Sequence, residues 1–504
     1  MFSSHRDSLY LLLSAIGLYA ISETGIFLFY PVTCVLLFVL VLVRLFILHT
    51  RTDNLRYFYI MSYASVAWTV FGQLLSFRAF YSLNGFDLSL PYLPIGESLD
   101  LWQYLCKSLS LTFLYSSLFI LFSSTSFVRE QEVRFTNSLV QLLTLKQRTL
   151  PRLSFVIGIL CSSLLIFLVL KGVLGWRGNM NDRDIGYGLS WWVPFMELSL
   201  QLLPPISALP FSLDRTKIFY RIAATVFFTV GAYVAFAIGR RSIVYYLFAV
   251  IYSYIFYYRL VNGWLPKLSL ARIIVLSLVF YILPKLLLFS QFLRVLNFST
   301  IDLWSISSSY EAFIEDNAQI EMALAGQELN YLSRPLLHSS LALVLKLKSF
   351  EFSYFSDLVD SFLMSLPSFI FPYKVGLLSS KTVVGNVLGI SSDWISTPPT
   401  IAFVSFGLPG FIIYPFFQVY SFSLFIFFTY RLGLVSASVK PSIIIFSSFM
   451  IGNLVQGFTE GNSVNLIRPF VVLFAVLSLV YYFYRFNLQS PSRGRRRNSY
   501  IPPP

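Results

Sequence analysis

Long apolar stretches separated by short polar connections repeat along most of the chain. A hydrocarbon core about 30 Å thick is crossed by roughly 20 apolar residues in a helix, so each such stretch predicts one transmembrane helix. About twelve stretches meet or approach this length: residues 9–21, 26–48, 58–77, 101–122, 153–170, 192–209, 219–238, 243–258, 273–289, 401–430, 443–458 and 464–484. The pattern therefore predicts an all-α polytopic membrane protein.

Composition supports this class. The chain of 504 residues is 56% hydrophobic and only 12% charged, which excludes an ordinary soluble domain of this length. Cys34, Cys106 and Cys161 all lie in apolar stretches without a CxxC pair, so we interpret them as packing residues rather than as a disulfide framework or zinc site. The first apolar stretch resembles a signal peptide in length, but we expect it to be a retained helix because further spans follow directly.

Basic residues gather in alternate connections between these stretches. They include Arg44, Arg51, Arg56, Arg129, Arg134, Arg148, Arg152, Arg215, Lys217, Arg259, Lys267, Arg272, Arg431, Lys440 and, in the tail, Arg493, Arg495, Arg496 and Arg497. The positive-inside rule places these connections and both termini in the cytoplasm. Anionic lipid headgroups then account for the net charge of +14, and no nucleic-acid partner is indicated.

The resulting division has four parts. Residues 1–293 form an N-terminal bundle of about nine spans, residues 294–398 a large extracytoplasmic loop, residues 399–487 about three further spans, and residues 488–504 a basic cytoplasmic tail. Leucines at helical spacing and several aromatic residues in the loop predict amphipathic helices lying across the membrane face: Leu332, Leu336, Leu337, Leu341, Leu345, Phe350, Phe352, Tyr354, Phe355 and Phe362.

Two short stretches carry candidate chemistry. In SRPLLHSS, Pro335 predicts a helix start, which places Arg334 at the helix N-terminus and His338 within the first turn. An anion would offset the unfavourable position of Arg334, although a surface arginine paired with a loop carboxylate is the simpler alternative. In FAIGRRSI, Arg240 and Arg241 interrupt an apolar run, either as topological punctuation or as a site.

Other reaction classes have no motif here. The chain lacks a GxxxxGK[ST] phosphate loop, a GxGxxG fingerprint, an HExxH helix and a GxSxG elbow. Asp182 and Asp184 in NDRDIG come closest to a carboxylate pair that would chelate the cation of a nucleotide sugar, but they share a short turn with Arg183 and are interpreted as a solvated loop. Its histidines are His5, His49 and His338. We therefore expect neither a metal nor another cofactor, and no nucleotide-activated donor.

The GRRS stretch and residues 395–417, ISTPPTIAFVSFGLPGFIIYPFF, resemble the Wzy-type O-antigen or oligosaccharide repeat-unit polymerases of bacteria. The resemblance covers the layout of most of the chain and the motifs of short pieces. One departure concerns the Pro-Pro-Thr turn, which an acidic residue often follows in that family. Here Thr400 leads into Ile401, so no carboxylate is carried over.

The resemblance implies a metal-independent glycosyltransferase of the bacterial inner membrane. It would transfer a growing glycan from undecaprenyl diphosphate to a new lipid-linked repeat, with a chain-length regulator as a further candidate partner. Arg240, Arg241, Arg334 and Arg468 are the candidate diphosphate-binding residues, because guanidinium groups can stabilise a leaving diphosphate without a metal. His338 is the first candidate general base and Glu460 the second.

Simpler interpretations remain beside each of these roles. Arg240 and Arg241 could extend to the outer headgroups, and Glu460 could be an ordinary turn residue that pairs with Arg468. A lipid-linked oligosaccharide flippase or another transporter is a competing function, although no internal repeat is visible in the sequence. An O-antigen ligase would use the same donor and differ only in its acceptor.

Overall fold

The computed structural model describes residues 2–24, 30–50, 58–67, 69–70, 98–145, 149–170, 193–213, 216–238, 240–263, 266, 340–347, 350–365, 371, 377, 380–387, 397–436, 439–459 and 463–489. Within these ranges the chain forms α-helices and no β-strand. The predicted all-α class is confirmed for this part of the chain. The predicted span 273–289 and most of the predicted outer loop lie outside the described residues.

Most helices closely follow the apolar stretches. Their bounds are α1 Phe2–Thr24, α2 Tyr30–Thr50, α4 Ser98–Ser123, α5 Ser126–Leu145, α6 Leu150–Leu170, α7 Val193–Ser212, α8 Ile218–Ile238, α9 Arg240–Asn262, α13 Ser340–Lys346, α14 Ser356–Ser365, α15 Ser380–Val387, α16 Pro398–Phe406, α17 Gly410–Arg431, α18 Lys440–Thr459 and α19 Ser463–Gln489. A further helical segment, Phe58–Ala67, precedes α4.

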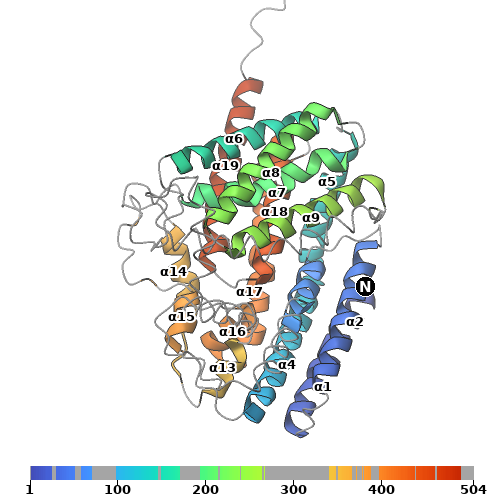
Figure 1. Ribbon diagram of the computed structural model, residues 1–504, viewed down its shortest axis with the longest axis vertical. Coiled ribbons are helices and arrows are strands. Elements are labelled where there is room, and N and C mark those ends of the chain that lie inside the picture. Colours follow the sequence, from blue (N-terminus) through green and yellow to red (C-terminus); the bar gives the residue numbers. More distant parts are fainter. Residues whose placement is uncertain are drawn as a thin grey trace, which may run out of the picture.

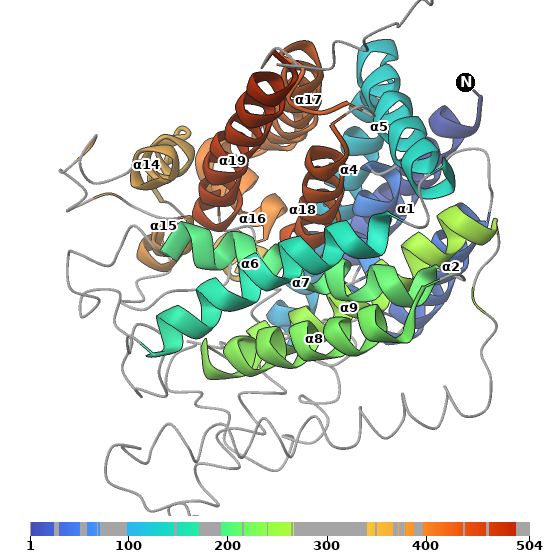
Figure 2. The ribbon, with the colours of Figure 1, turned by 90° about the horizontal axis from the view of Figure 1, so that it is seen from above.

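The helices run in two main directions. Figure 1 shows α1, α2 and α4 along the long axis of the molecule, whereas α6, α8 and α9 lie crosswise at one end. The view from above agrees, because α6, α8 and α9 are seen from the side there (Figure 2). The short helices α13, α15 and α16 lie at the opposite end from α5 and from the C-terminal end of α19 (Figure 1).

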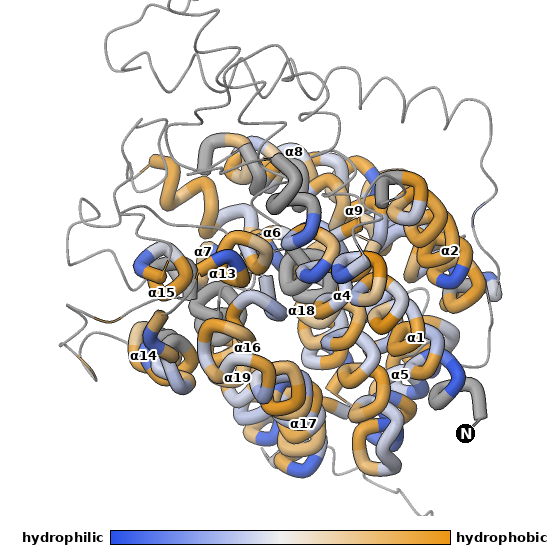
Figure 3. Tube along the Cα trace, turned by 90° about the horizontal axis from the view of Figure 1, so that it is seen from below, coloured by the Kyte–Doolittle hydropathy of each residue, from blue (hydrophilic) through white to orange (hydrophobic). Residues whose placement is uncertain are grey.

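Four described helices are long and apolar enough to cross a membrane. They comprise Gln103–Ser123 within α4, Leu150–Leu170, Ile218–Phe236 within α8, and Gly410–Arg431. Large apolar side chains are exposed along α2, α6, α8 and α17, and the tubes of α2 and α17 are coloured mostly hydrophobic (Figure 3). Such surfaces suit hydrocarbon rather than water, so the chain is a membrane-embedded helical protein.

Hydroxyl groups join helices inside the bundle. Along the contact between α1 and α4, the Ser110 hydroxyl donates to the Ala15 carbonyl at 2.6 Å, and the Ser117 hydroxyl donates to the Ser8 carbonyl at 2.7 Å. Small polar residues allow close helix approach where a lipid environment gives no hydrophobic driving force. The α1–α4 pair is thus fastened at two levels.

Three features of the described residues differ from the sequence prediction. Residues 350–355, whose aromatics were predicted to lie in amphipathic helices, form no helix because their backbone bonds to the last turn of α16 instead. The predicted single span 401–430 is two helices, α16 and α17, broken at Gly407, Leu408 and Pro409. The basic connection after α4 contains a further helix, α5, which buries Val128, Phe135, Leu139, Leu142 and Leu143 against the core. α5 is amphipathic and too polar to register as a span in a hydropathy reading.

Candidate functional site

The structure describes three of the six predicted site residues, and of those only the backbone. Arg334, His338 and Glu460 lie outside the described residues. Arg240 and Arg241 belong to the first turn of α9, and Arg468 belongs to the second turn of α19, with only their helical backbone described. The geometry around these positions therefore comes from their described neighbours.

The neighbour of the SRPLLHSS stretch is α13, whose first residue is Ser340. The Ser340 hydroxyl lies 2.8 Å from the Thr400 hydroxyl, which in turn lies 2.8 Å from the Thr397 hydroxyl. Ser340 and Thr400 are fully buried and Thr397 nearly so. This hydroxyl cluster of Ser340, Thr397 and Thr400 joins two stretches that are about 60 residues apart and that carry the quoted loop and Thr-Pro-Pro motifs.

The Thr-Pro-Pro sequence explains why a helix begins at this point. Thr397 has extended backbone angles, φ −103° and ψ 156°, as expected for a residue that precedes proline. Its side chain accepts a hydrogen bond from the Thr400 backbone N–H at 3.4 Å and so forms the N-cap of α16. Pro398 and Pro399 occupy the first turn, where proline is favoured. The positive end of the α16 dipole therefore faces the hydroxyl cluster.

The other end of α16 meets the break before α17. Gly407 has φ 63°, a left-handed conformation that favours glycine, and its N–H donates to the Phe403 carbonyl at 2.7 Å. Beyond the break the Tyr414 hydroxyl lies 3.1 Å from the Ser405 hydroxyl, which fastens α17 back onto α16. Both ends of this nine-residue helix are therefore held by specific hydrogen bonds.

A buried ion pair lies among α1, α2 and the segment Phe58–Ala67. The Arg44 guanidinium contacts the Asp7 carboxylate at 2.5 Å, and that carboxylate is almost fully buried. The Tyr63 hydroxyl is within hydrogen-bonding reach of Arg44. A charge buried in this way is stable only with its partner, so the pair fixes the α1–α2 hairpin against the bundle.

Two further buried charges lie at helix ends. Glu132 of α5 accepts a hydrogen bond from the Phe58 backbone N–H at 2.8 Å, at the start of the segment Phe58–Ala67. Arg259 of α9 donates to the Leu48 carbonyl at 3.4 Å, in the last turn of α2. Each charge has the sign that the helix dipole favours at its position. Both residues therefore have a structural role in joining helices.

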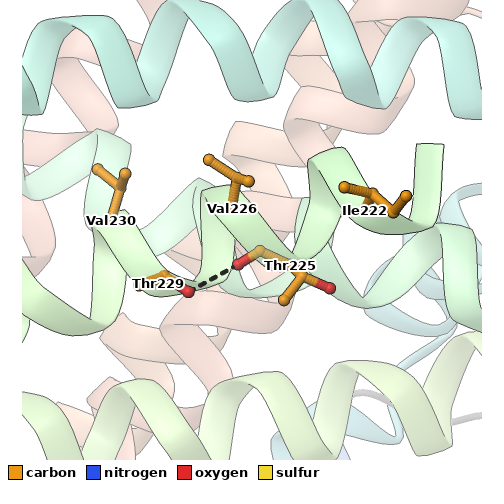
Figure 4. A pocket seen from close by; sticks show the side chains of 5 residues that line it. All are labelled: Ile222, Thr225, Val226, Thr229 and Val230. Atoms are coloured by element: carbon orange, nitrogen blue, oxygen red, sulfur yellow. Dashed lines mark hydrogen bonds between the residues drawn. The ribbon is translucent and has the colours of Figure 1, made fainter. Parts of the chain in front are cut away.

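A shallow apolar groove of about 360 Å³ runs along α8 (Figure 4). Its lining residues are Ile222, Thr225, Val226, Thr229 and Val230. The hydroxyls of Thr225 and Thr229 donate to backbone carbonyls of their own helix at 3.0 Å, which leaves an apolar surface. The lining residues include no titratable group, so the groove is not a candidate reaction site.

The described residues contain no group of three or more histidine, cysteine, aspartate or glutamate side chains that could hold a metal ion. Comparison of the chain with protein-family models, with curated proteins and with solved structures finds no match. The hydroxyl cluster is thus defined by the geometry of this chain alone.

Proposed function

We propose that the protein polymerises lipid-linked oligosaccharide repeat units at the outer face of the bacterial inner membrane. The observation that carries the proposal is the contact between Ser340 and Thr400, because it joins the SRPLLHSS stretch, which carries the candidate base, to the Thr-Pro-Pro stretch that resembles a repeat-unit polymerase. His338 precedes Ser340 by only two residues in the sequence, so it is the candidate base nearest to this contact along the chain. The membrane-embedded helical fold is compatible with a lipid-linked donor.

In the proposed reaction the acceptor sugar hydroxyl attacks the anomeric carbon of the donor glycan. The bond from that carbon to the diphosphate oxygen breaks, and undecaprenyl diphosphate leaves with the electron pair. His338 would accept the hydroxyl proton, with Glu460 as the alternative base. Because negative charge develops on the leaving diphosphate, fixed cations stabilise the transition state more than the ground state.

Arg240 and Arg241 suit the role of diphosphate ligands for a reason that the described backbone supplies. They begin α9, and cations in the first turn of a helix are opposed by the macrodipole. A bound diphosphate would contact both the guanidinium groups and the free N–H groups of that turn. Arg334 and Arg468 remain the further candidate ligands.

The test is the surface glycan of a strain that lacks the gene and is complemented with variants. We expect Thr400→Val to abolish or shorten the glycan ladder, because it removes the hydroxyl that links Ser340 to Thr397. Thr429→Val is the matched control: Thr429 is equally buried, but its hydroxyl bonds only within α17, to the Ile426 carbonyl. Immunoblots establish that both variants reach the membrane in normal amounts.

The same strains separate the competing functions. A polymerase defect leaves a single repeat on its lipid anchor, whereas a ligase or flippase defect removes even that repeat. His338→Ala and Arg240→Ala should reproduce the polymerase pattern. If the deletion strain kept a full ladder, or lost the single repeat, the polymerase proposal would fail.

A further inference from the structure

An aromatic segment, residues 350–355, crosses the break between α16 and α17. Its rings form a continuous series on that break: Phe350 lies 5.9 Å from Phe403, Tyr354 lies 5.8 Å from Phe406, and Phe355 lies 4.6 Å from Phe406, all between ring centroids. Phe355 also stacks on Tyr414 of α17 at 5.5 Å. The segment is thus held firmly against both helices.

Backbone hydrogen bonds place this segment in register with the end of α16. The Ser353 N–H donates to the Val404 carbonyl and the Tyr354 N–H to the Ser405 carbonyl, each at 3.2 Å. The hydroxyls of Ser353 and Ser405 lie 3.0 Å apart. Both carbonyls belong to the last turn of α16, where the helix itself supplies no further N–H donor.

Directly after these bonds the chain adopts an unusual conformation. Tyr354 and Phe355 have φ 44° and 67°, in the left-handed region that bulky residues rarely occupy. The reversal directs Phe355 onto Tyr414 and leaves Tyr354 outside, 66% exposed. Strained backbone of this kind is retained mainly where it serves a site. The packing of Phe355 on Tyr414 accounts for the left-handed backbone of Phe355. It does not account for that of Tyr354, whose side chain is exposed and whose conformation would suit glycine better.

We propose that Tyr354 and the neighbouring exposed ring of Phe352 form a stacking surface for a sugar ring of the glycan. The two rings lie 5.9 Å apart at 66°, so they present two faces at an angle. Phe352 is 41% exposed and rests against Gly407, which fixes its position. Rigid aromatic rings bind at little entropic cost, and the Tyr354 hydroxyl adds a hydrogen-bonding group.

The charge beside the surface favours a sugar over the membrane interface. The exposed Glu351 directly precedes Phe352 in the chain. Interfacial segments carry basic residues that attract anionic headgroups, and carboxylates there would be repelled. A neutral, hydroxyl-rich ring can instead stack on the aromatics while one of its hydroxyls donates to the Glu351 carboxylate. This inference rests on the proposed function for its ligand class.

The test is direct binding, measured with the full-length protein in nanodiscs. The probe is the soluble oligosaccharide released by mild acid from the host's lipid-linked repeat unit, observed by saturation-transfer NMR. We expect transfer from the wild type and from Tyr354→Trp, and loss of transfer from Tyr354→Gly. Glycine adopts the left-handed conformation without strain, although it loses the ring contact with Phe406, so the fold should be kept. The melting temperature of this variant, measured beside the wild type, separates a loss of binding from unfolding.

Tyr482→Ala is the control, because Tyr482 is similarly exposed, at 64%, but lies toward the C-terminal end of α19. This variant should leave transfer unchanged. Undiminished transfer from Tyr354→Gly would overturn the inference. So would quenching by brominated lipids of the fluorescence that Tyr354→Trp adds to that of the eight native tryptophans, because it would place the ring at position 354 in the bilayer. The binding assay does not depend on catalytic activity. If binding required Tyr354 but deletion of the gene left the glycan ladder intact, the polymerase proposal would fail and the sugar-binding inference would stand.

Discussion

Gly410, the first residue of α17, tests how closely α16 and α17 approach. A Cβ atom at this position would lie 1.8 Å from the carbonyl oxygen of Ala402 and 2.6 Å from its carbonyl carbon. Real Cβ atoms stay at least about 3.0 Å from such neighbours, so Gly410→Ala requires α16 and α17 to move apart by about 1.2 Å. A backbone carbonyl inside α16 cannot rotate away as a flexible side chain could.

The cost follows from that separation. Overpacking of a well-packed contact costs about 1–3 kcal/mol. The bond between Ser405 and Tyr414, now 3.1 Å, would also be stretched beyond hydrogen-bonding distance at a cost of about 1 kcal/mol. We therefore expect Gly410→Ala to lower the free energy of unfolding by about 2–4 kcal/mol and to lower the melting temperature clearly.

The assay is thermal unfolding of the purified protein in detergent. Gly17→Ala is the matched control, because a Cβ at Gly17 of α1 meets nothing within 4 Å. That variant should melt at or slightly above the wild-type temperature, since alanine is the better helix former. Equal melting temperatures for Gly410→Ala and Gly17→Ala would refute the close approach of α16 and α17.

Two further predictions concern ion pairs. Arg44→Gln should destabilise the protein by about 3–5 kcal/mol, because it leaves the Asp7 carboxylate buried without its cation. Adding Asp7→Asn should restore part of the lost stability. A double-mutant cycle that showed no coupling between the two substitutions would contradict the buried pair. The hydrogen bond from Lys107 lowers the pKa of Glu23 below its ordinary value. Its stabilisation is thus present above the ordinary pKa and lost as the pH falls through the lowered one. NMR titration of labelled glutamate carboxyls should show the pKa of Glu23 rising in Lys107→Met, and an unchanged pKa would count against the contact.

The helices that were predicted best from the sequence are those that consist of a long apolar run. The predicted spans 101–122 and 153–170 fall within α4 and α6, because long apolar runs with few charges have one stable form in a membrane. α5 was missed because Arg129, Glu130 and Arg134 lower its mean hydropathy while a separate face is buried. Its signal was the helical periodicity of Val128, Phe135, Leu139 and Leu142, which a search for spans does not weigh.

The site was predictable only in its parts. The Thr-Pro-Pro turn is visible in the sequence, but its contact with Ser340 depends on two segments about 60 residues apart and on no local pattern. The break at Gly407 is a visible glycine and proline signal, yet its consequence, a separate short helix, depends on the close approach at Gly410. The left-handed conformation of Tyr354 has no sequence signal, since tyrosine rarely adopts it.

The start of α16 has a consequence for how a helix can begin away from water. A helix ordinarily opens with backbone N–H groups that lack acceptors, and each one left bare in a dry interior is costly. Pro398 and Pro399 bring no N–H, Thr400 donates to the Thr397 side chain, and Ile401 donates to the Thr397 carbonyl. The N–H groups of the first four helical residues, Pro398 to Ile401, are thereby absent or satisfied. A pair of prolines, usually regarded as a helix breaker, here allows a helix to start without solvent.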